Sequence, residues 1–192
     1  MLQLGAPFSL DEIRDSFAQE HPAVHAFFAA IPPEQFFAAP PEIWSPADNL
    51  AHLIKSCQPV LLGLKLPRLA LRMRFGLAEA PSGSLAALRD RYVNVALAGG
   101  GRASGRYLPE VTDTSAASRE HLLAEWQRHG AALLAALEGW SEDDLEKYRG
   151  EHPLLGLLTI REILFFTLYH NLHHVNDVQR LLGQPEAEWF ST

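Results

Sequence analysis

The chain has 192 residues, a formal net charge of −7 and 47% apolar residues, a composition typical of a globular protein that buries one core. Its single cysteine, Cys57, excludes an internal disulfide, and no run of about 18 uncharged apolar residues offers a membrane span. The start of the chain has no basic, apolar leader. We therefore expect a single domain over residues 1–192, a cytoplasmic location and no membrane partner.

The negative net charge also bears on nucleic acid, because DNA and RNA binding depends mainly on Lys and Arg that neutralise phosphates. Lys65, Arg68, Arg72 and Arg74 bring four cations into ten residues. Such a run is more typical of a solvated helix face than of an anion site. We therefore expect no nucleic-acid partner.

The first predicted helix covers residues 10–30. Ser9 and Glu12 have the spacing of a capping box, in which each side chain bonds a free backbone N–H of the first turn. Pro22 lies inside this span and predicts a kink or a restart. His21 and His25 flank the proline, so we expect them to be structural or exposed rather than paired.

The second predicted helix covers residues 46–66. Ser45 is a favourable N-cap, Pro46 suits the first helical position, and Asp48 faces the positive end of the helix dipole. Along its apolar stripe, Asn49, His52 and Ser56 form a polar edge at helical spacing. His52 is either a satisfied structural histidine or a residue that lines a pocket.

Two shorter helices are predicted at about 68–77 and 84–97, followed by the glycine-rich segment 99–105. This segment lacks the order of a phosphate-binding motif and is more typical of a mobile lid or a crossover. A third long helix is expected from about 115 to 137, and residues 148–156 then form a connection. No segment has the period-2 alternation of a strand.

The last predicted helix is the most informative segment. Thr159 and Glu162 cap its start and Gly183 its end. His170 and His174 lie four residues apart on the apolar face, so both rings point to one place beside the helix. This spacing suits a metal site, and it also suits two neutral histidines that bond each other or their neighbours. His173, about 100° around the helix, is not expected to be a ligand.

Two segments resemble the DinB/YfiT-like superfamily of metalloenzymes: WSPADNLAHLI at 44–54 and the segment 152–183. The resemblance implies an all-α fold, a four-helix bundle with a long crossover between helices two and three and with short extra helices. It implies one divalent metal ion, such as Zn or Ni, bound by His52, His170 and His174, and it implies frequent homodimers. Relatives often carry a glycine-glutamine pair after the second histidine, but this chain has Asn176 and Asp177. The role of the relatives' glutamine therefore cannot be transferred to this chain.

The resemblance favours a metal-dependent enzyme that acts on a small molecule, such as a transferase that uses a low-molecular-weight thiol. The alternatives are a hydrolase, an isomerase, a non-catalytic stress-related metal-binding protein, and a bundle whose histidines only bond one another. Asp177 and Asn49 are the candidate catalytic residues. Asp177, one turn beyond His174, could orient a ligand histidine or take a proton, or be a solvated charge near the helix end, and Asn49 could contact a bound thiol or water. Arg102 and Arg106 are the candidates for binding a carboxylate of a thiol cofactor, and solvated loop arginines are the alternative.

Overall fold

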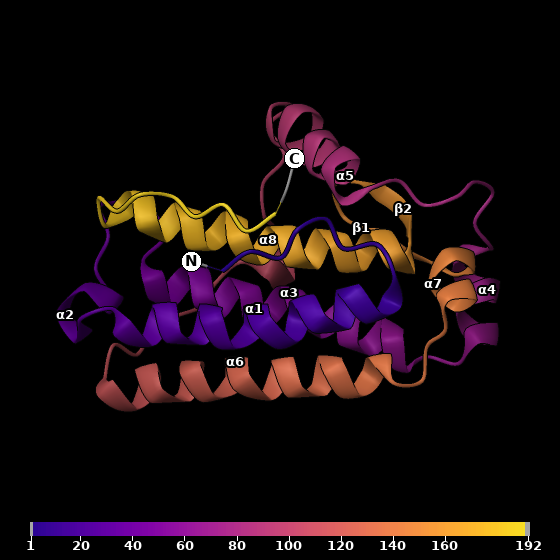
Figure 1. The fold of residues 1–192 in the computed structure, drawn as a ribbon. Coiled ribbons are helices and arrows are strands. Elements are labelled where there is room, and N and C mark those ends of the chain that lie inside the picture. The colour runs from indigo at the N-terminus through magenta and orange to yellow at the C-terminus, as the bar shows by residue number, and fades with distance from the viewer. Residues whose placement is uncertain (1, 191–192) are drawn as a thin grey trace.

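The computed structural model describes residues 2–190 and is 63% helical (Figure 1). Within these residues, four helices have 20 residues or more: α1 (Leu10–Ala30), α3 (Pro46–Lys65), α6 (Ala116–Leu137) and α8 (Ile160–Leu181). α1 packs against α6 and α8, and α3 packs against the same two helices. The long helices therefore lie side by side around a shared interior, and the prediction of a mainly helical fold is confirmed.

The helix starts follow the predicted caps. Ser9 and Glu12, Ser45 and Asp48, and Thr159 and Glu162 each exchange both bonds of a capping box. Pro22 lies inside a continuous α1, so the helix does not restart there. Because Pro22 is exposed and α1 packs along its length, the helix loses one backbone bond and keeps its tertiary contacts.

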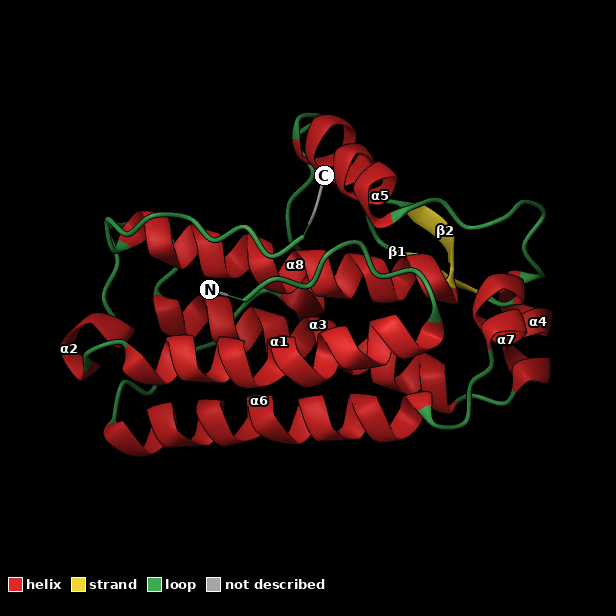
Figure 2. Cartoon of the chain, in the orientation of Figure 1, coloured by secondary structure: helices red, strands yellow, loops and turns green. Residues whose placement is uncertain are grey.

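The segment between α3 and α6 carries four short elements (Figure 2). They are α4 (Arg68–Phe75), α5 (Leu85–Arg91), the π-helical turn Tyr92–Leu97 and the 3-10 turn Gly105–Tyr107. Two further short helices are α2 (Pro33–Phe36) before α3 and α7 (Glu142–Lys147) after α6. α5 packs on α8, and the 3-10 turn packs on α3. The crossover therefore returns to the two helices that carry the predicted histidines.

A small antiparallel hairpin corrects the expectation that the chain has no strands. β1 (Arg149–His152) pairs with β2 (Gly156–Thr159), and Gly156 adopts a positive φ of 75° at the end of the turn. Both strands have four residues, which is too short for period-2 alternation to appear in the sequence. The hairpin leads directly into α8 and so fixes where that helix starts.

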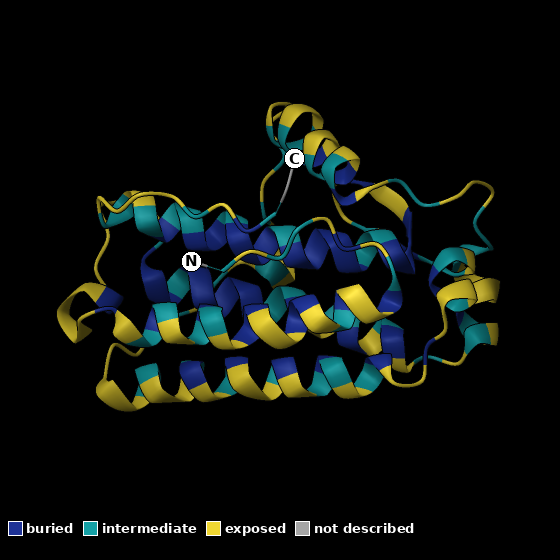
Figure 3. Ribbon diagram, viewed as in Figure 1, coloured by how far each residue is buried: buried dark blue, intermediate teal, exposed yellow. Residues whose placement is uncertain are grey.

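The buried residues form two apolar clusters along the long helices (Figure 3). On α8, Leu168 belongs to one cluster and Leu172 to the other. His170 lies between them, so a polar side chain occurs in the interior where the two apolar regions meet. Cys57 is buried in the second cluster, as a small apolar residue would be.

The two ends of the described chain also lie together. The N–H of Leu4 donates to the carbonyl oxygen of Trp189 at 2.6 Å, and Gly5 bridges to Phe190. In Figure 1 the indigo and yellow segments run alongside each other over α1 and α8. No helix within residues 2–190 combines the length and the apolar character needed to cross a bilayer.

Candidate metal centre

Three histidines from two helices meet in the interior. His52 comes from α3, and His170 and His174 come from α8, one turn apart. The Nε2 atom of His170 lies 3.2 Å from Nε2 of His52 and 3.1 Å from Nε2 of His174. All three side chains are buried, and one ring nitrogen of each lies within 4.8 Å of the others. The structure thus brings together the three residues that the resemblance implied as ligands.

The opposite nitrogens of two of these rings have fixed partners. Nδ1 of His52 donates to the carbonyl oxygen of Tyr107 at 2.6 Å, and Nδ1 of His174 donates to Oδ1 of Asn49 at 2.7 Å. The Asn49 amide cannot be turned around, because its Nδ2 donates to the carbonyl oxygen of Ser45 at 3.0 Å. His52 and His174 therefore carry their protons on Nδ1.

This choice of tautomer determines what the centre can hold. With Nδ1 protonated, the Nε2 atoms of His52 and His174 carry only lone pairs, and both face Nε2 of His170. His170 can supply at most one proton to the two contacts. At least one of these two lone pairs thus receives no proton from His170, which is costly in a buried site, and the Ser56 hydroxyl approaches Nε2 of His52 only at 3.4 Å. A cation that accepts all three lone pairs removes this conflict, so the residues present fit a three-histidine metal site.

Aromatic neighbours hold the rings in place. Trp44 lies 4.9 Å from His52 and stacks on His174 at 5.9 Å, measured between ring centroids. Phe166 stacks on His170 at 4.9 Å. Burial among these groups lowers the pKa of His170 and of His174 well below 6.5, so both rings stay neutral and keep a lone pair for a metal.

Asp177 and His173 lie outside the three-nitrogen centre. The Oδ2 atom of Asp177 is 3.4 Å from Nδ1 of His174 and 3.6 Å from Nε2 of His173, and its other oxygen pairs with Arg180. Asn49 makes the shorter contact with His174. Of the two candidate catalytic residues, Asn49 is thus placed to orient His174, while Asp177 lies at the edge of the three-histidine centre.

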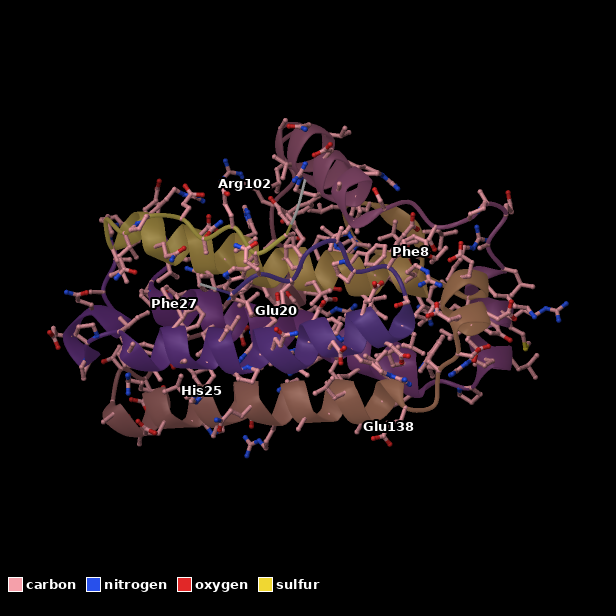
Figure 4. The ribbon with its side chains drawn as sticks, in the orientation of Figure 1. Phe8, Glu20, His25, Phe27, Arg102 and Glu138 are labelled. Carbon is pink, nitrogen blue, oxygen red and sulfur yellow. The ribbon has the colours of Figure 1, made fainter. Side chains whose placement is uncertain are left out.

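A cavity of about 640 Å³ borders the centre. It is lined by His52 and His170, by apolar residues of α3, α4 and α8, and by both candidate arginines, Arg102 and Arg106. Arg106 donates to the hydroxyl of Tyr107 at 3.0 Å, and Arg102 is exposed and projects away from α8 (Figure 4). The crossover therefore borders both the cavity and the three-histidine centre.

A family model described as the DinB superfamily matches residues 16–178 of the chain. The chain belongs to the DinB superfamily. The resemblance noted in the two sequence segments is therefore confirmed over most of the length. No curated protein matches this DinB chain.

Among solved structures, this DinB chain is similar to the colibactin self-resistance protein ClbS, whose crystal structure is a complex with double-stranded DNA. The sequences are 17% identical, the TM-score is 0.52, and the match covers 92% of this chain and 96% of ClbS. This likeness extends over nearly the whole of both chains and concerns the fold.

The ClbS complex overturns the expectation that nucleic acid is excluded as a partner. That expectation relied on net charge, which sums over the whole molecule. Contact with DNA depends on the local density of cations at the surface, so an acidic chain can present a basic face. Lys65, Arg72 and Arg74 are exposed in the DinB chain, whereas Arg68 pairs with Asp144.

Sequence reasoning missed three residues around the DinB site. Trp44 was treated as part of a helix entry, yet its ring packs on two histidines. Tyr107 contributes a backbone carbonyl, which leaves no signal in residue type. His152 was treated as part of a connection, but it lines the same cavity.

Proposed function

We propose that this DinB-superfamily chain binds one divalent metal ion through His52, His170 and His174 and acts as a metal-dependent enzyme on a small molecule. The observation that carries the proposal is the fixed Nδ1–H tautomer of His52 and His174. Because of it, the unprotonated Nε2 atoms of these two residues face Nε2 of His170. When bound, a divalent ion with three neutral ligands supplies Lewis-acid chemistry and lowers the pKa of a coordinated thiol or water.

The residues around the centre have separable roles in this proposal. Asn49 and the Tyr107 carbonyl hold two ligand rings in one orientation. The buried aromatic rings limit water at the centre, and the cavity provides room for a substrate beside it. Arg102 and Arg106, at the cavity wall, suit a carboxylate on a substrate or on a low-molecular-weight thiol.

The reaction that we favour is S-transfer from such a thiol, with hydrolysis, isomerisation or a non-catalytic metal-binding role in stress as alternatives. We also infer that residues 1–192 act as one domain whose four long helices form a bundle. A homodimer stays a prediction from the resemblance, and a cytoplasmic location stays a prediction from the single cysteine.

Metal binding is tested on protein that is purified without an affinity tag. We expect elemental analysis to find about one divalent ion per chain, and we expect His52→Ala, His170→Ala and His174→Ala each to lose it. His173→Ala is the matched control, because His173 neighbours His174 and pairs with Asp177 instead. Retention of metal by His170→Ala, or its loss in His173→Ala alone, would contradict the proposed ligand set.

Turnover is tested separately with an electrophile and one of four thiols: glutathione, bacillithiol, mycothiol or cysteine. We expect a thiol-dependent rate in the metal-loaded protein and none above background in His170→Ala. Equal rates in the two proteins would refute metal-dependent S-transfer and leave the other reactions or the binding role.

DNA binding is a second candidate function, and one surface favours it. Lys65, Arg72 and Arg74 are exposed at the end of α3 and on α4, and none of them forms an ion pair within the described residues. Together with the DNA complex of ClbS, this surface motivates a gel-shift assay with a short duplex at several salt concentrations.

We expect the affinity for the duplex to fall as salt rises, and to fall further when the three cations are changed to glutamine. Arg128→Gln is the control, because Arg128 lies on α6 and pairs with Glu125. No binding at 50 mM salt, or equal loss in the control, would remove this candidate.

A further inference from the structure

His152 lies beside the proposed centre but is not part of it. It ends β1 and lines the same cavity as His52 and His170. Its ring packs on Phe166 with a centroid separation of 4.1 Å, and Phe166 stacks on His170 at 4.9 Å. One phenyl ring therefore separates His152 from the three-histidine centre.

The hairpin fixes the tautomer of His152. The backbone N–H groups of Leu154 and Leu155 donate to its Nδ1 atom at 3.2 and 3.1 Å. A nitrogen that accepts two such bonds carries a lone pair, so the proton of the neutral ring lies on Nε2. Arg91 of α5 holds the turn by donating to the carbonyl oxygen of Leu155. The tautomer is thus set by backbone groups on a braced turn.

The charge state of His152 follows from the same surroundings. Burial lowers the pKa of His152 to about 4, and the nearby Arg91 guanidinium adds to this shift. The ring is therefore neutral near pH 7 and keeps one N–H, which is on Nε2.

Other polar groups at the cavity and at the three-histidine centre use their protons differently. The Nδ1–H groups of His52 and His174 are bonded to the Tyr107 carbonyl and to Asn49. The hydroxyl of Thr167, another lining residue, donates to the carbonyl oxygen of Ile163. His152 thus differs from these groups, because no residue of the described chain accepts its Nε2–H.

We propose that His152 is a binding residue that donates its Nε2–H to an acceptor oxygen of the cavity's ligand. The ligand class is a small molecule with an apolar body and a carbonyl or carboxylate oxygen, since the adjoining walls are apolar residues such as Phe75, Ile163 and Leu164. This inference deepens the proposed function, because the same cavity adjoins the metal centre, yet the donor itself needs no metal.

The first test reads the tautomer of the wild-type protein. In ¹⁵N-labelled protein at pH 7, we expect the His152 side chain to give the spectrum of a neutral ring that is protonated at Nε2, with and without added zinc. An Nδ1–H tautomer or an imidazolium would overturn the proposal.

The second test compares two probes of similar shape, benzamide and toluene, of which only benzamide has an acceptor oxygen. We expect wild type to prefer benzamide and the His152→Asn variant to lose about five- to tenfold of that preference, the contribution of one neutral hydrogen bond. Asparagine keeps an oxygen that can accept the bonds of Leu154 and Leu155, but its amide nitrogen takes the place of Cδ2, so no donor stands at the position of Nε2. His121→Asn, a change of an exposed histidine on α6, is the matched control.

An unchanged preference in His152→Asn, or no binding of benzamide to wild type, would overturn the donor role. The measurements are made on metal-free and on zinc-supplied protein. If elemental analysis finds no bound metal, the proposed metal function fails, while the tautomer and the benzamide preference still decide the role of His152.

Discussion

Asn49 is the residue whose removal most directly tests how the centre is oriented. Its Oδ1 accepts the Nδ1 proton of His174 at 2.7 Å, and its side chain is buried. Asn49→Leu would free the ring to rotate or to change tautomer. We expect metal affinity to fall about 10- to 100-fold, the usual effect of losing a partner of a ligand histidine. Competition with a chromogenic chelator measures the change.

Asp177 provides the control for Asn49, because it approaches the same nitrogen from 3.4 Å. We expect Asp177→Asn to change metal affinity by less than about threefold, since hydrogen bonds at the longer distance are weak. A larger loss in Asp177→Asn than in Asn49→Leu would assign the orienting role to the carboxylate instead.

Glu20 is a buried acid that makes folding stability depend on pH. It lies in the interior between α1 and α8 (Figure 4), where Asn171 donates to one of its oxygens at 2.9 Å and the other oxygen has no partner. Burial raises the pKa of Glu20 well above 4.5. Burial and the charge of Glu20 raise the pKa of the Cys57 thiol to about 12, so this thiol stays neutral.

The raised pKa of Glu20 fixes the sign of the effect. Below pH 4.5 Glu20 is protonated in both the folded and the unfolded states, and its own contribution to stability is most favourable. Above pH 4.5, Glu20 ionises only in the unfolded chain. The free energy of unfolding of wild type therefore falls by about 1.4 kcal/mol per pH unit relative to Glu20→Gln, until the pH reaches the pKa of Glu20 in the folded state. Urea unfolding of both proteins at pH 5 and pH 7 measures the difference. A constant difference between them would contradict burial of the neutral acid.

At the scale of elements, α1 and α6 are in close contact at Gly130. A Cβ atom built on Gly130 would lie 2.8 Å from Cγ of His21, and the His21 ring itself packs on Trp126 with a centroid separation of 4.5 Å. His21 has no room to move, since it is buried against both residues. The glycine therefore sets the distance between the two helices.

Gly130→Ala is expected to destabilise the protein by about 1–3 kcal/mol, because overpacking outweighs the gain in helix propensity. Gly63→Ala is the matched control. Gly63 is also helical, and nothing lies within 4 Å of its added Cβ, so we expect a gain of about 0.5–1 kcal/mol. Chemical denaturation of both variants checks the two signs, and a stabilised Gly130→Ala would show that the helices can separate without cost.

At the scale of the whole molecule, metal binding and folding are coupled, since the ligands come from α3 and α8 and meet only in the folded chain. Zinc at 100 times its dissociation constant adds about 2.7 kcal/mol to stability. For a chain of this size we expect the Tm to rise by about 5–10 °C. Differential scanning calorimetry measures the rise, which should vanish in His170→Ala. An equal rise in that variant would indicate binding elsewhere.

Much of the fold was predictable from the sequence, because its signals are local. Ser9, Ser45 and Thr159 each precede a carboxylate by three residues, and a box of this kind forms from neighbours alone. The spacing of His170 and His174 placed both on one face of α8 for the same reason. The family resemblance then supplied His52, which no local pattern links to α8.

The tertiary structure decided the remaining features, because they depend on residues far apart in the chain. The tautomers of His52 and His174 follow from Tyr107 and Asn49, which lie 55 and 125 positions away in sequence. The hairpin depends on pairing between two strands that are too short to show a pattern. The sequence alone determined the long helices and the pairing of His170 with His174 on one face, and the resemblance added His52. Only the packed helices decided which ring nitrogens face one another, because a hydrogen-bond partner is defined by distance in space.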